Sequence, residues 1–217
     1  MAVLTQRPRV NALESLLRQK AAKPLVFVLC LLPFAWLIYA AFNDLLGANP
    51  AEALIRSTGD WTLRMLCMVL AVTPLRQWIN TPSLARFRRM LGLFVFFYAV
   101  LHLLGYAWLD MGFELDELAR DIAKRPFILV GFLAFVLLTA LAVTSPKRIL
   151  KAMGARRWQM LHRSIYLIAG LALLHFFWMR AGKNNFNEVL VYAAIIATLL
   201  LARTWKRFAG RSKQKNA

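Results

Sequence analysis

Six long apolar stretches dominate this chain of 217 residues. Each has close to the roughly 20 residues that an α-helix needs to cross the hydrocarbon core of a bilayer. The stretches are residues 25–42, 61–79, 89–109, 126–144, 158–179 and 187–204. Because a spanning helix satisfies its backbone hydrogen bonds internally, such stretches predict helices. The fold class that they indicate is an all-α integral membrane protein, a six-helix transmembrane bundle.

The stretches use up most of the chain and leave no room for a separate soluble domain. Hydrophobic residues make up 60% of the sequence and the mean hydropathy is +0.54, which is too apolar for an ordinary soluble domain. The predicted parts are a cytoplasmic N-terminal segment, a transmembrane domain and a basic cytoplasmic tail, at residues 1–24, 25–205 and 206–217. Within the first part, Val10, Leu13, Leu16 and Leu17 share one helical face, which suits a helix lying on the membrane surface.

Charged residues are sorted between the loops. Basic residues gather before the first stretch, after the second, after the fourth and after the sixth, whereas the other loops hold nearly all the acids. Only Glu14 lies on the basic side. The positive-inside rule then places both termini in the cytoplasm. Topology and anionic lipid account for the net charge of +18, so nucleic-acid binding is not needed to explain it.

All three histidines, His102, His162 and His175, lie inside or at the edge of apolar stretches. An intramembrane imidazole serves as a hydrogen-bonding group between helices, a proton relay or an axial haem ligand. At 1.5 Å per residue, His102 lies about 21 Å beyond Arg88 and His175 about 27 Å beyond Arg157. These similar depths place both side chains in the outer half of the bilayer. We therefore expect them to face each other as the two ligands of one b-type haem.

His162 does not fit that pair. It lies about 8 Å beyond Arg157, near the cytoplasmic surface. It precedes His175 by 13 residues, which leaves the two side chains about 140° apart around a straight helix. Both face the stretch 89–109 only if their helix bends, and Gly170 is the expected place for a bend. Otherwise His162 points elsewhere.

Five segments of this chain resemble one known family in sequence and in order. They are TGDWTLRMLCMVLAVTPLR (58–76), RRMLGLFVFFYAVLHLLGY (88–106), KRPFILVGF (124–132), LTALAVTS (138–145) and RRWQMLHRSIYLIAG (156–170). They are similar to the MsrQ family, also called YedZ, of haem-binding membrane subunits in bacterial periplasmic methionine-sulfoxide reductase systems. The resemblance covers roughly residues 25 to 205. MsrQ belongs to a wider group of ferric-reductase-like transmembrane domains.

The resemblance implies an electron-transfer subunit in the bacterial inner membrane. Electrons from the quinone pool or a cytoplasmic flavin reductase would pass through haem b, with FMN as a further cofactor. They would leave to a periplasmic molybdopterin-containing reductase, which is expected to carry out the sulfoxide reduction that repairs oxidised proteins. The histidine positions of the family fall on His102, His162 and His175. The wider group has two histidines on each of two helices, so the number of haems here is one or two.

Several arginines are candidates for contacts with cofactors. Arg64, near the outer end of its stretch, either snorkels to the interface or pairs with a haem propionate. Arg76, Arg88, Arg89 and Arg163 lie at the cytoplasmic end as orientation charges, and one or two of them could hold an FMN phosphate or an inner propionate. No glycine-rich loop indicates a nicotinamide site, so nothing suggests that the chain oxidises NADPH itself.

Other features are interpreted as structural. Cys30 and Cys67 are expected to be small apolar fillers. Thr73-Pro74 is expected to end or kink one helix, and Thr144-Ser145-Pro146 to close another. The outer loop 110–125 carries five acids, which either steer a periplasmic partner or only solvate the loop. Two other functions stay open: a stand-alone ferric or quinone reductase, and a non-redox membrane anchor for a periplasmic enzyme.

Overall fold

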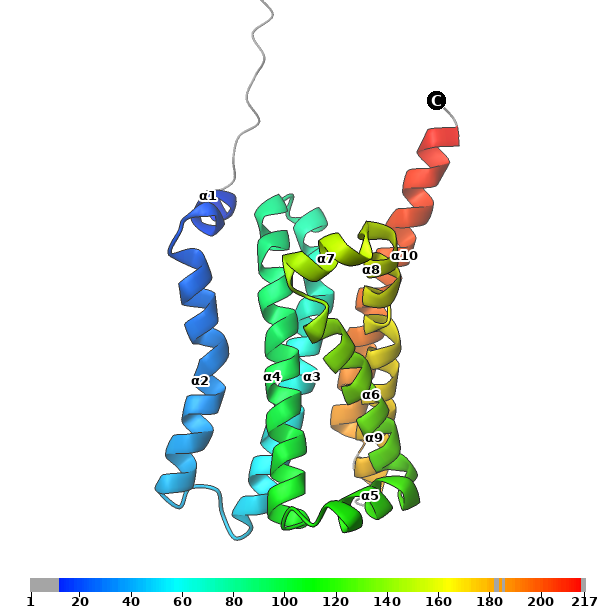
Figure 1. Cartoon of the computed structure of the whole chain (residues 1–217). Helices are drawn as coiled ribbons and strands as arrows, with labels where there is room; N and C mark the ends of the chain where they lie inside the picture. The colour runs from blue at the N-terminus through cyan, green and yellow to red at the C-terminus, as the bar shows by residue number, and fades with distance from the viewer. Residues whose placement is uncertain (1–11, 182–183, 185, 216–217) are drawn as a thin grey trace, which may run out of the picture.

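The computed structural model describes residues 12–181, 184 and 186–215, and the regular structure in these residues is helical (Figure 1). The predicted all-α fold is therefore confirmed. The elements include the 3-10 helix η1 and the π-helix η2. In chain order they are α1 (Ala12–Arg18), α2 (Ala22–Phe42), α3 (Pro50–Trp78), η1 (Pro82–Phe87), α4 (Arg88–Gly105), η2 (Tyr106–Asp110), α5 (Leu115–Lys124), α6 (Pro126–Val143), α7 (Lys147–Met153), α8 (Ala155–His162), α9 (Ile165–Ala181) and α10 (Asn187–Lys215).

Five helical segments of the described chain are long and apolar enough to cross a membrane, which makes this a multi-pass membrane protein. They are Ala22–Phe42, Pro82–Asp110, Pro126–Val143, Ala155–Ala181 and Asn187–Trp205. The helix α3 is not among them, although it runs beside α4 along the bundle (Figure 1). Helix α1 and the C-terminal end of α10 lie at the same end of the bundle. The sixth crossing, and the side of the membrane on which the termini lie, stay predictions.

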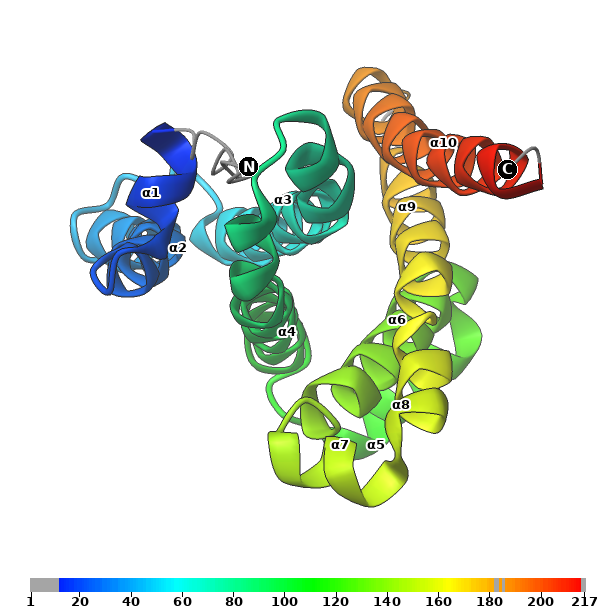
Figure 2. The same cartoon turned by 90° about the horizontal axis from the view of Figure 1, so that it is seen from above.

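Five helices form a closed ring. Helix α3 packs on α4 and α6 packs on α9, while contacts of α4 with α6, α9 with α10 and α10 with α3 complete the circle (Figure 2). Helix α2 lies outside this ring, against α3 and α4. The fully buried Tyr98 of α4 donates a hydrogen bond of 2.7 Å to the backbone carbonyl of Cys30 in α2. The ring thus has an interior that α2 does not enter.

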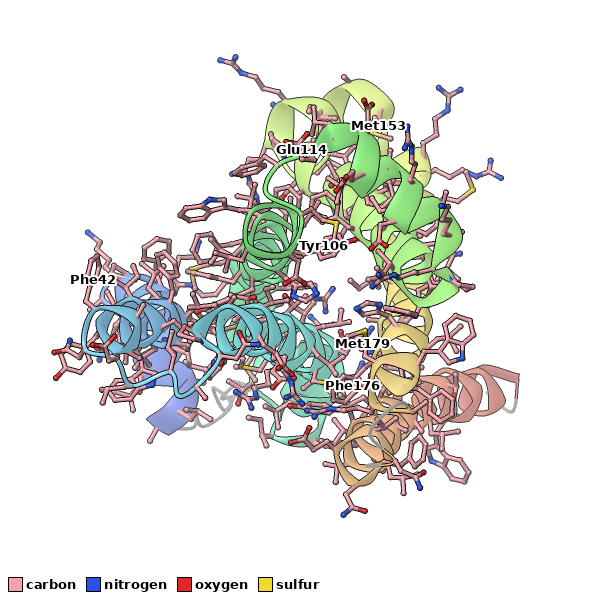
Figure 3. The ribbon with its side chains drawn as sticks, turned by 90° about the horizontal axis from the view of Figure 1, so that it is seen from below. Phe42, Tyr106, Glu114, Met153, Phe176 and Met179 are labelled. Carbon is pink, nitrogen blue, oxygen red and sulfur yellow. The ribbon has the colours of Figure 1, made fainter. Side chains whose placement is uncertain are left out.

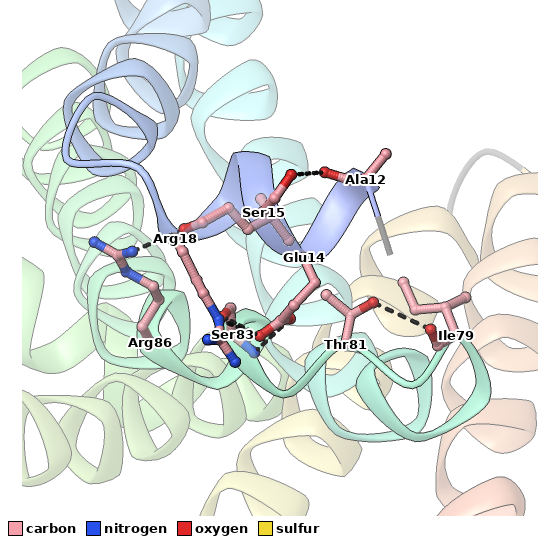
Figure 4. A network of polar contacts seen from close by, with 9 residues as sticks. Ala12, Glu14, Ser15, Arg18, Ile79, Thr81, Ser83 and Arg86 are labelled. Carbon is pink, nitrogen blue, oxygen red and sulfur yellow. Dashed lines mark hydrogen bonds and ion pairs between the residues drawn. The ribbon is translucent and has the colours of Figure 1, made fainter. Parts of the chain in front are cut away.

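A polar network joins α1 to η1 (Figure 4). The carboxylate of Glu14 is buried and accepts hydrogen bonds from the Ser83 hydroxyl at 2.6 Å and the Ser83 amide at 3.1 Å. Arg18 donates to the same carboxylate at 2.8 Å, and Arg86 donates to the Leu17 carbonyl at 2.7 Å. The hydrogen bonds from Ser83, above all that of its hydroxyl, lower the pKa of Glu14. The only acid on the basic side of the sequence therefore holds α1 in place.

Helix α1 agrees with the helix expected near residues 10–20, but its apolar side chains are divided. Leu17 packs against the core, whereas Leu13 and Leu16 are exposed. Val10 lies outside the described residues. A position on the membrane surface stays a prediction for this helix. At the other end of the chain, α10 continues through Lys215, so it extends into the segment predicted as the basic tail.

Local structure decides between two predicted alternatives in one place and departs from the predictions in two others. Of the two alternatives expected at Thr73-Pro74, an end or a kink, the end is excluded, since α3 continues to Trp78. The outer loop contains the helix α5 (Leu115–Lys124), and its Asp121 pairs with the C-cap residue Arg125, four residues later, at 2.8 Å. The stretch 158–179 is interrupted at Arg163–Ser164, whereas Gly170 lies inside α9. The predicted closure after residue 143 is confirmed, since α6 ends at Val143.

Candidate functional site

The ring of helices brings His102 and His175 together. His102 lies three residues before the end of α4, and His175 lies six residues before the end of α9. Their ring centres are 6.2 Å apart and their planes are inclined by 75°. The two histidines therefore face each other as the depth calculation expected, although 73 positions separate them in the chain, and their role as haem ligands stays a prediction.

Each of the two imidazoles uses one nitrogen for a hydrogen bond to the backbone of a neighbouring helix. Nδ1 of His102 lies 2.8 Å from the Ile55 carbonyl oxygen in α3, and Nδ1 of His175 lies 2.7 Å from the Phe127 carbonyl oxygen in α6. A carbonyl oxygen only accepts, so Nδ1 must carry the proton in both rings. In the neutral form, Nε2 then keeps its lone pair free for a metal ion.

The spacing of the rings fits an axially ligated haem iron. Two metal–imidazole bonds of about 2 Å, with about 1 Å from each nitrogen to its ring centre, give a separation of about 6 Å. Within the described residues, no three His, Cys, Asp or Glu side chains gather as ligands for a metal ion. Two imidazoles alone do not complete a protein-built metal site. They do suit haem, whose porphyrin supplies the other ligands.

Aromatic side chains hold the ring of helices closed around this pair. Phe96 of α4 stacks on Phe135 of α6, with ring centres 5.9 Å apart. Phe176 of α9 meets Tyr192 of α10 edge to face at 5.8 Å, and Figure 3 shows Phe176 at this junction. These contacts occur where neighbouring helices of the ring meet, so the aromatics pack the helices together.

His162 lies elsewhere and is engaged differently. Its Nε2 is 3.1 Å from the Thr144 hydroxyl, and its ring stacks on Trp158 with ring centres 3.8 Å apart. The Trp158 indole donates to the Thr144 carbonyl at 2.9 Å. The interruption at Arg163–Ser164 separates His162 from the helix that carries His175. The structure thus joins His162 to the end of α6, and its role as a haem ligand stays a prediction.

Arg64 is exposed in the middle of α3 and reaches α10. Its Nε donates to the Tyr192 hydroxyl at 3.2 Å, and its guanidinium lies 4.7 Å from the centre of the Trp61 ring. Together with Asp60 and Glu188 it lines a cavity of about 270 Å³. These contacts support a role for Arg64 in packing α3 on α10, and pairing with a propionate stays a prediction.

The four arginines that the sequence places at the cytoplasmic end have different surroundings in the structure. Arg88 donates to the Thr73 hydroxyl at 2.6 Å, and it lies within electrostatic range of Arg76 and Arg203. Arg89 donates to the Ser145 hydroxyl at 3.1 Å. Arg163 is exposed. Of the four predicted arginines, the structure therefore brings only Arg76 and Arg88 into one group.

Arg203 completes that group, and the sequence analysis missed it. It donates to the Tyr166 hydroxyl at 2.9 Å and to the Leu70 carbonyl, so it links α10 to α9 and α3. Its Nε is buried and has no hydrogen-bond partner among the described residues. The available signal was its position inside the last apolar stretch, where a charge is costly unless it has a purpose. Three arginines from three helices form a cationic cluster, defined as Arg76, Arg88 and Arg203.

At the end of the bundle near the histidine pair, η2 is joined to α5. The Tyr106 hydroxyl donates to the Asp121 carboxylate, which also pairs with Arg125. Tyr106 follows His102 by four residues, which is about one helical turn. The surface helix α5 is therefore fixed directly to the end of the helix that carries one of the two histidines.

Sequence comparisons show which family the chain belongs to. The family model described as the ferric reductase like transmembrane component matches residues 58–174, which include His102 and His162 and end one residue before His175. A protein of Polaromonas naphthalenivorans (strain CJ2) is 73% identical over 87% of this chain and 86% of its own length. It is named protein-methionine-sulfoxide reductase heme-binding subunit MsrQ. The chain belongs to the MsrQ family.

More distant MsrQ proteins extend the match. The MsrQ of Herminiimonas arsenicoxydans is 50% identical over 88% of both chains. That of Caulobacter vibrioides is 41% identical over 94% of this chain and 98% of its own. The family resemblance identified from the five sequence segments is thereby confirmed over nearly the whole described fold.

Proposed function

We propose that this chain is a membrane electron-transfer subunit that binds haem b between His102 and His175. The observation that carries the proposal is the 6.2 Å separation of the two imidazole centres inside a ring of apolar helices. The names of its MsrQ relatives, which describe heme-binding subunits, support the same choice of cofactor. We expect the chain to lie in the bacterial inner membrane and to serve a periplasmic molybdopterin-containing methionine-sulfoxide reductase.

The protein's own contribution is to orient ligands and to exclude water. The Ile55 and Phe127 carbonyls hold the Nδ1 protons of the two histidines, which fixes both rings and leaves Nε2 of each free. The surrounding helices supply an apolar environment that favours neutral ligands. A haem bound there supplies a one-electron ferric–ferrous couple. Neither histidine needs to gain or lose a proton when an electron passes.

The two ends of the bundle suit the entry and exit of electrons. His102 lies three residues before the end of α4, which η2 connects to α5. The charge distribution assigns the end of the bundle where α5 lies (Figure 1) to the periplasm. The cluster of Arg76, Arg88 and Arg203 lies at the opposite, cytoplasmic end. We propose that this cluster holds the phosphate of FMN, which receives electrons from the quinone pool or a cytoplasmic flavin reductase. Arginine suits phosphate because its planar fork makes paired hydrogen bonds.

A reduced-minus-oxidised visible spectrum of the purified protein, with haem measured per chain, tests the haem proposal. We expect a low-spin b-type spectrum and one haem per chain, because His162 already uses its Nε2 on Thr144. Two haems per chain would show that His162 releases Thr144 to bind a second one. No haem after expression with ample haem would favour the alternative of a non-redox anchor.

The flavin proposal has its own test. Replacing Arg88 or Arg203 with Gln removes one positive charge from the cluster, and we expect the FMN content to fall several-fold for each variant. Arg163→Gln is the matched control, because Arg163 is an exposed arginine at the same end of the bundle. Equal FMN content in all three variants would remove the cluster from the flavin site without affecting the haem proposal.

A further inference from the structure

Two glycines lie directly against the two paired imidazoles. A Cβ atom placed on Gly59 of α3 would stand 3.0 Å from Cε1 and 3.1 Å from Nδ1 of His102. A Cβ atom on Gly131 of α6 would stand 2.8 Å from Nδ1 and 3.0 Å from Cε1 of His175. Favourable contacts between such atoms begin at about 3.5 Å. Any side chain at either position would therefore push the imidazole away.

The two contacts are built in the same way. Gly59 follows Ile55 by four residues, and Gly131 follows Phe127 by four residues. Ile55 and Phe127 are the residues whose carbonyls hold Nδ1 of the two histidines. Residues four apart lie one above the other on the same face of a helix. Each imidazole can reach its carbonyl only by lying flat across the position that the glycine leaves empty.

Helix formation does not explain these glycines. Glycine inside a helix costs about 1 kcal/mol relative to alanine. The helices that carry the histidines have glycines of their own, Gly92 in α4 and Gly170 in α9, and a Cβ on either would meet nothing within 4 Å. A Cβ on Gly59 or Gly131 would meet a paired imidazole, whereas a Cβ on Gly92 or Gly170 would meet open space.

We propose that Gly59 and Gly131 are positioning residues for the haem ligands. They leave the space in which each ring lies against a helix backbone, keep Nδ1–H on its carbonyl and thereby aim Nε2 at the iron. The inference rests on the proposed function, since it concerns the same pair of histidines. A purely structural role would be different, because glycines that only let helices pack closely would affect stability without changing the ligand field.

The test compares Gly59→Ala and Gly131→Ala with Gly92→Ala and Gly170→Ala as matched controls in the full-length protein. Haem per chain, the low-spin electron paramagnetic resonance signal, the midpoint potential and carbon monoxide binding to the reduced form are measured for each. We expect the two control variants to match the wild type. We expect Gly131→Ala, with the shorter contact, to weaken haem binding about 10- to 100-fold, as loss of an outer contact to a metal ligand does. Gly59→Ala should shift the low-spin signal and the midpoint potential in the same direction as Gly131→Ala does, but by a smaller amount.

The outcomes separate the two proposals. Wild-type signal and potential in both Gly59→Ala and Gly131→Ala would overturn the inference even if the haem lies between His102 and His175. Wild-type protein without a low-spin haem would overturn the proposed function itself. If Gly131→Ala accumulates poorly, the milder Gly59→Ala decides, because its spectrum is measured per folded chain. A change of stability with an unchanged spectrum would also count against the inference.

Discussion

The histidine pair and His162 differ in which ring nitrogen is hydrogen-bonded, although all three side chains belong to one bundle. His102 and His175 use Nδ1 on backbone carbonyls, which are fixed in position and cannot rotate away. His162 uses Nε2 on the Thr144 hydroxyl and lies flat on Trp158. The first arrangement leaves the more accessible ring nitrogen free, whereas the second occupies it. The nitrogen that is already hydrogen-bonded therefore distinguishes the two kinds of histidine, which their shared location in apolar stretches does not.

The largest effect should come from breaking the pair. His102→Ala or His175→Ala removes one of two axial ligands, so we expect the low-spin haem signal to disappear and most of the bound haem to be lost. Visible and electron paramagnetic resonance spectra of each purified variant measure this. The control is His162→Ala, which should keep the outer signal. Loss of all haem in His162→Ala alone, with both other variants intact, would reverse the assignment of the two regions.

A smaller effect is expected from the hydroxyl that engages His162. Thr144→Val leaves Nε2 of His162 without its partner, so we expect a loss of about 1 kcal/mol of stability with the haem spectrum unchanged. Thr139→Val is the matched control, because the Thr139 hydroxyl bonds only to the Phe135 carbonyl of its own helix. Thermal unfolding in detergent compares the two. A changed haem spectrum in Thr144→Val would show that His162 is linked to the outer pair after all.

The smallest effect concerns α1, which lies farthest from the histidine pair along the chain. The lowered pKa of Glu14 means that its ionised form contributes stability. That contribution is fully present above the ordinary pKa of glutamate and is lost as the pH falls through the lower pKa in the folded protein. The protection of the amides of residues 12–18, measured as the ratio of the intrinsic to the observed hydrogen-exchange rate, should therefore fall on acidification. In Glu14→Gln this protection should be lower already at neutral pH and less dependent on acid, whereas an unchanged protection profile would exclude Glu14 as the anchor.

The sequence predicts the helices, because each depends on a single apolar stretch. It also predicts that His102 and His175 face each other, because that follows from their depth in the membrane. The apolar stretches predicted the helices because burying backbone in lipid leaves few alternatives. Counting residues from Arg88 and Arg157 sufficed to pair His102 with His175. The early start of α3 could also have been found. Asn49 caps this helix by accepting from the Glu52 amide at 3.1 Å, and Pro50 follows as its first residue, which is a known start signal.

Features that depend on contacts between segments could not be predicted. The break at Arg163–Ser164 accompanies the attachment of Trp158 and His162 to the end of α6, and no local spacing encodes that attachment. From the sequence, Gly170 is the expected position of a bend, rather than Arg163–Ser164, because glycine lowers the cost of bending a helix. In the same way, Gly59 and Gly131 become meaningful only when an imidazole from another helix lies across them.

The helices of the ring follow one another in the chain in a fixed order. The closing contact of the ring joins α10 to α3, so the circle is completed by the helix that follows the other four ring helices in the chain. A chain interrupted before Asn187 has both paired histidines but lacks the helix that links α9 back to α3. Both paired histidines therefore precede, in the chain, the helix that closes the ring around them.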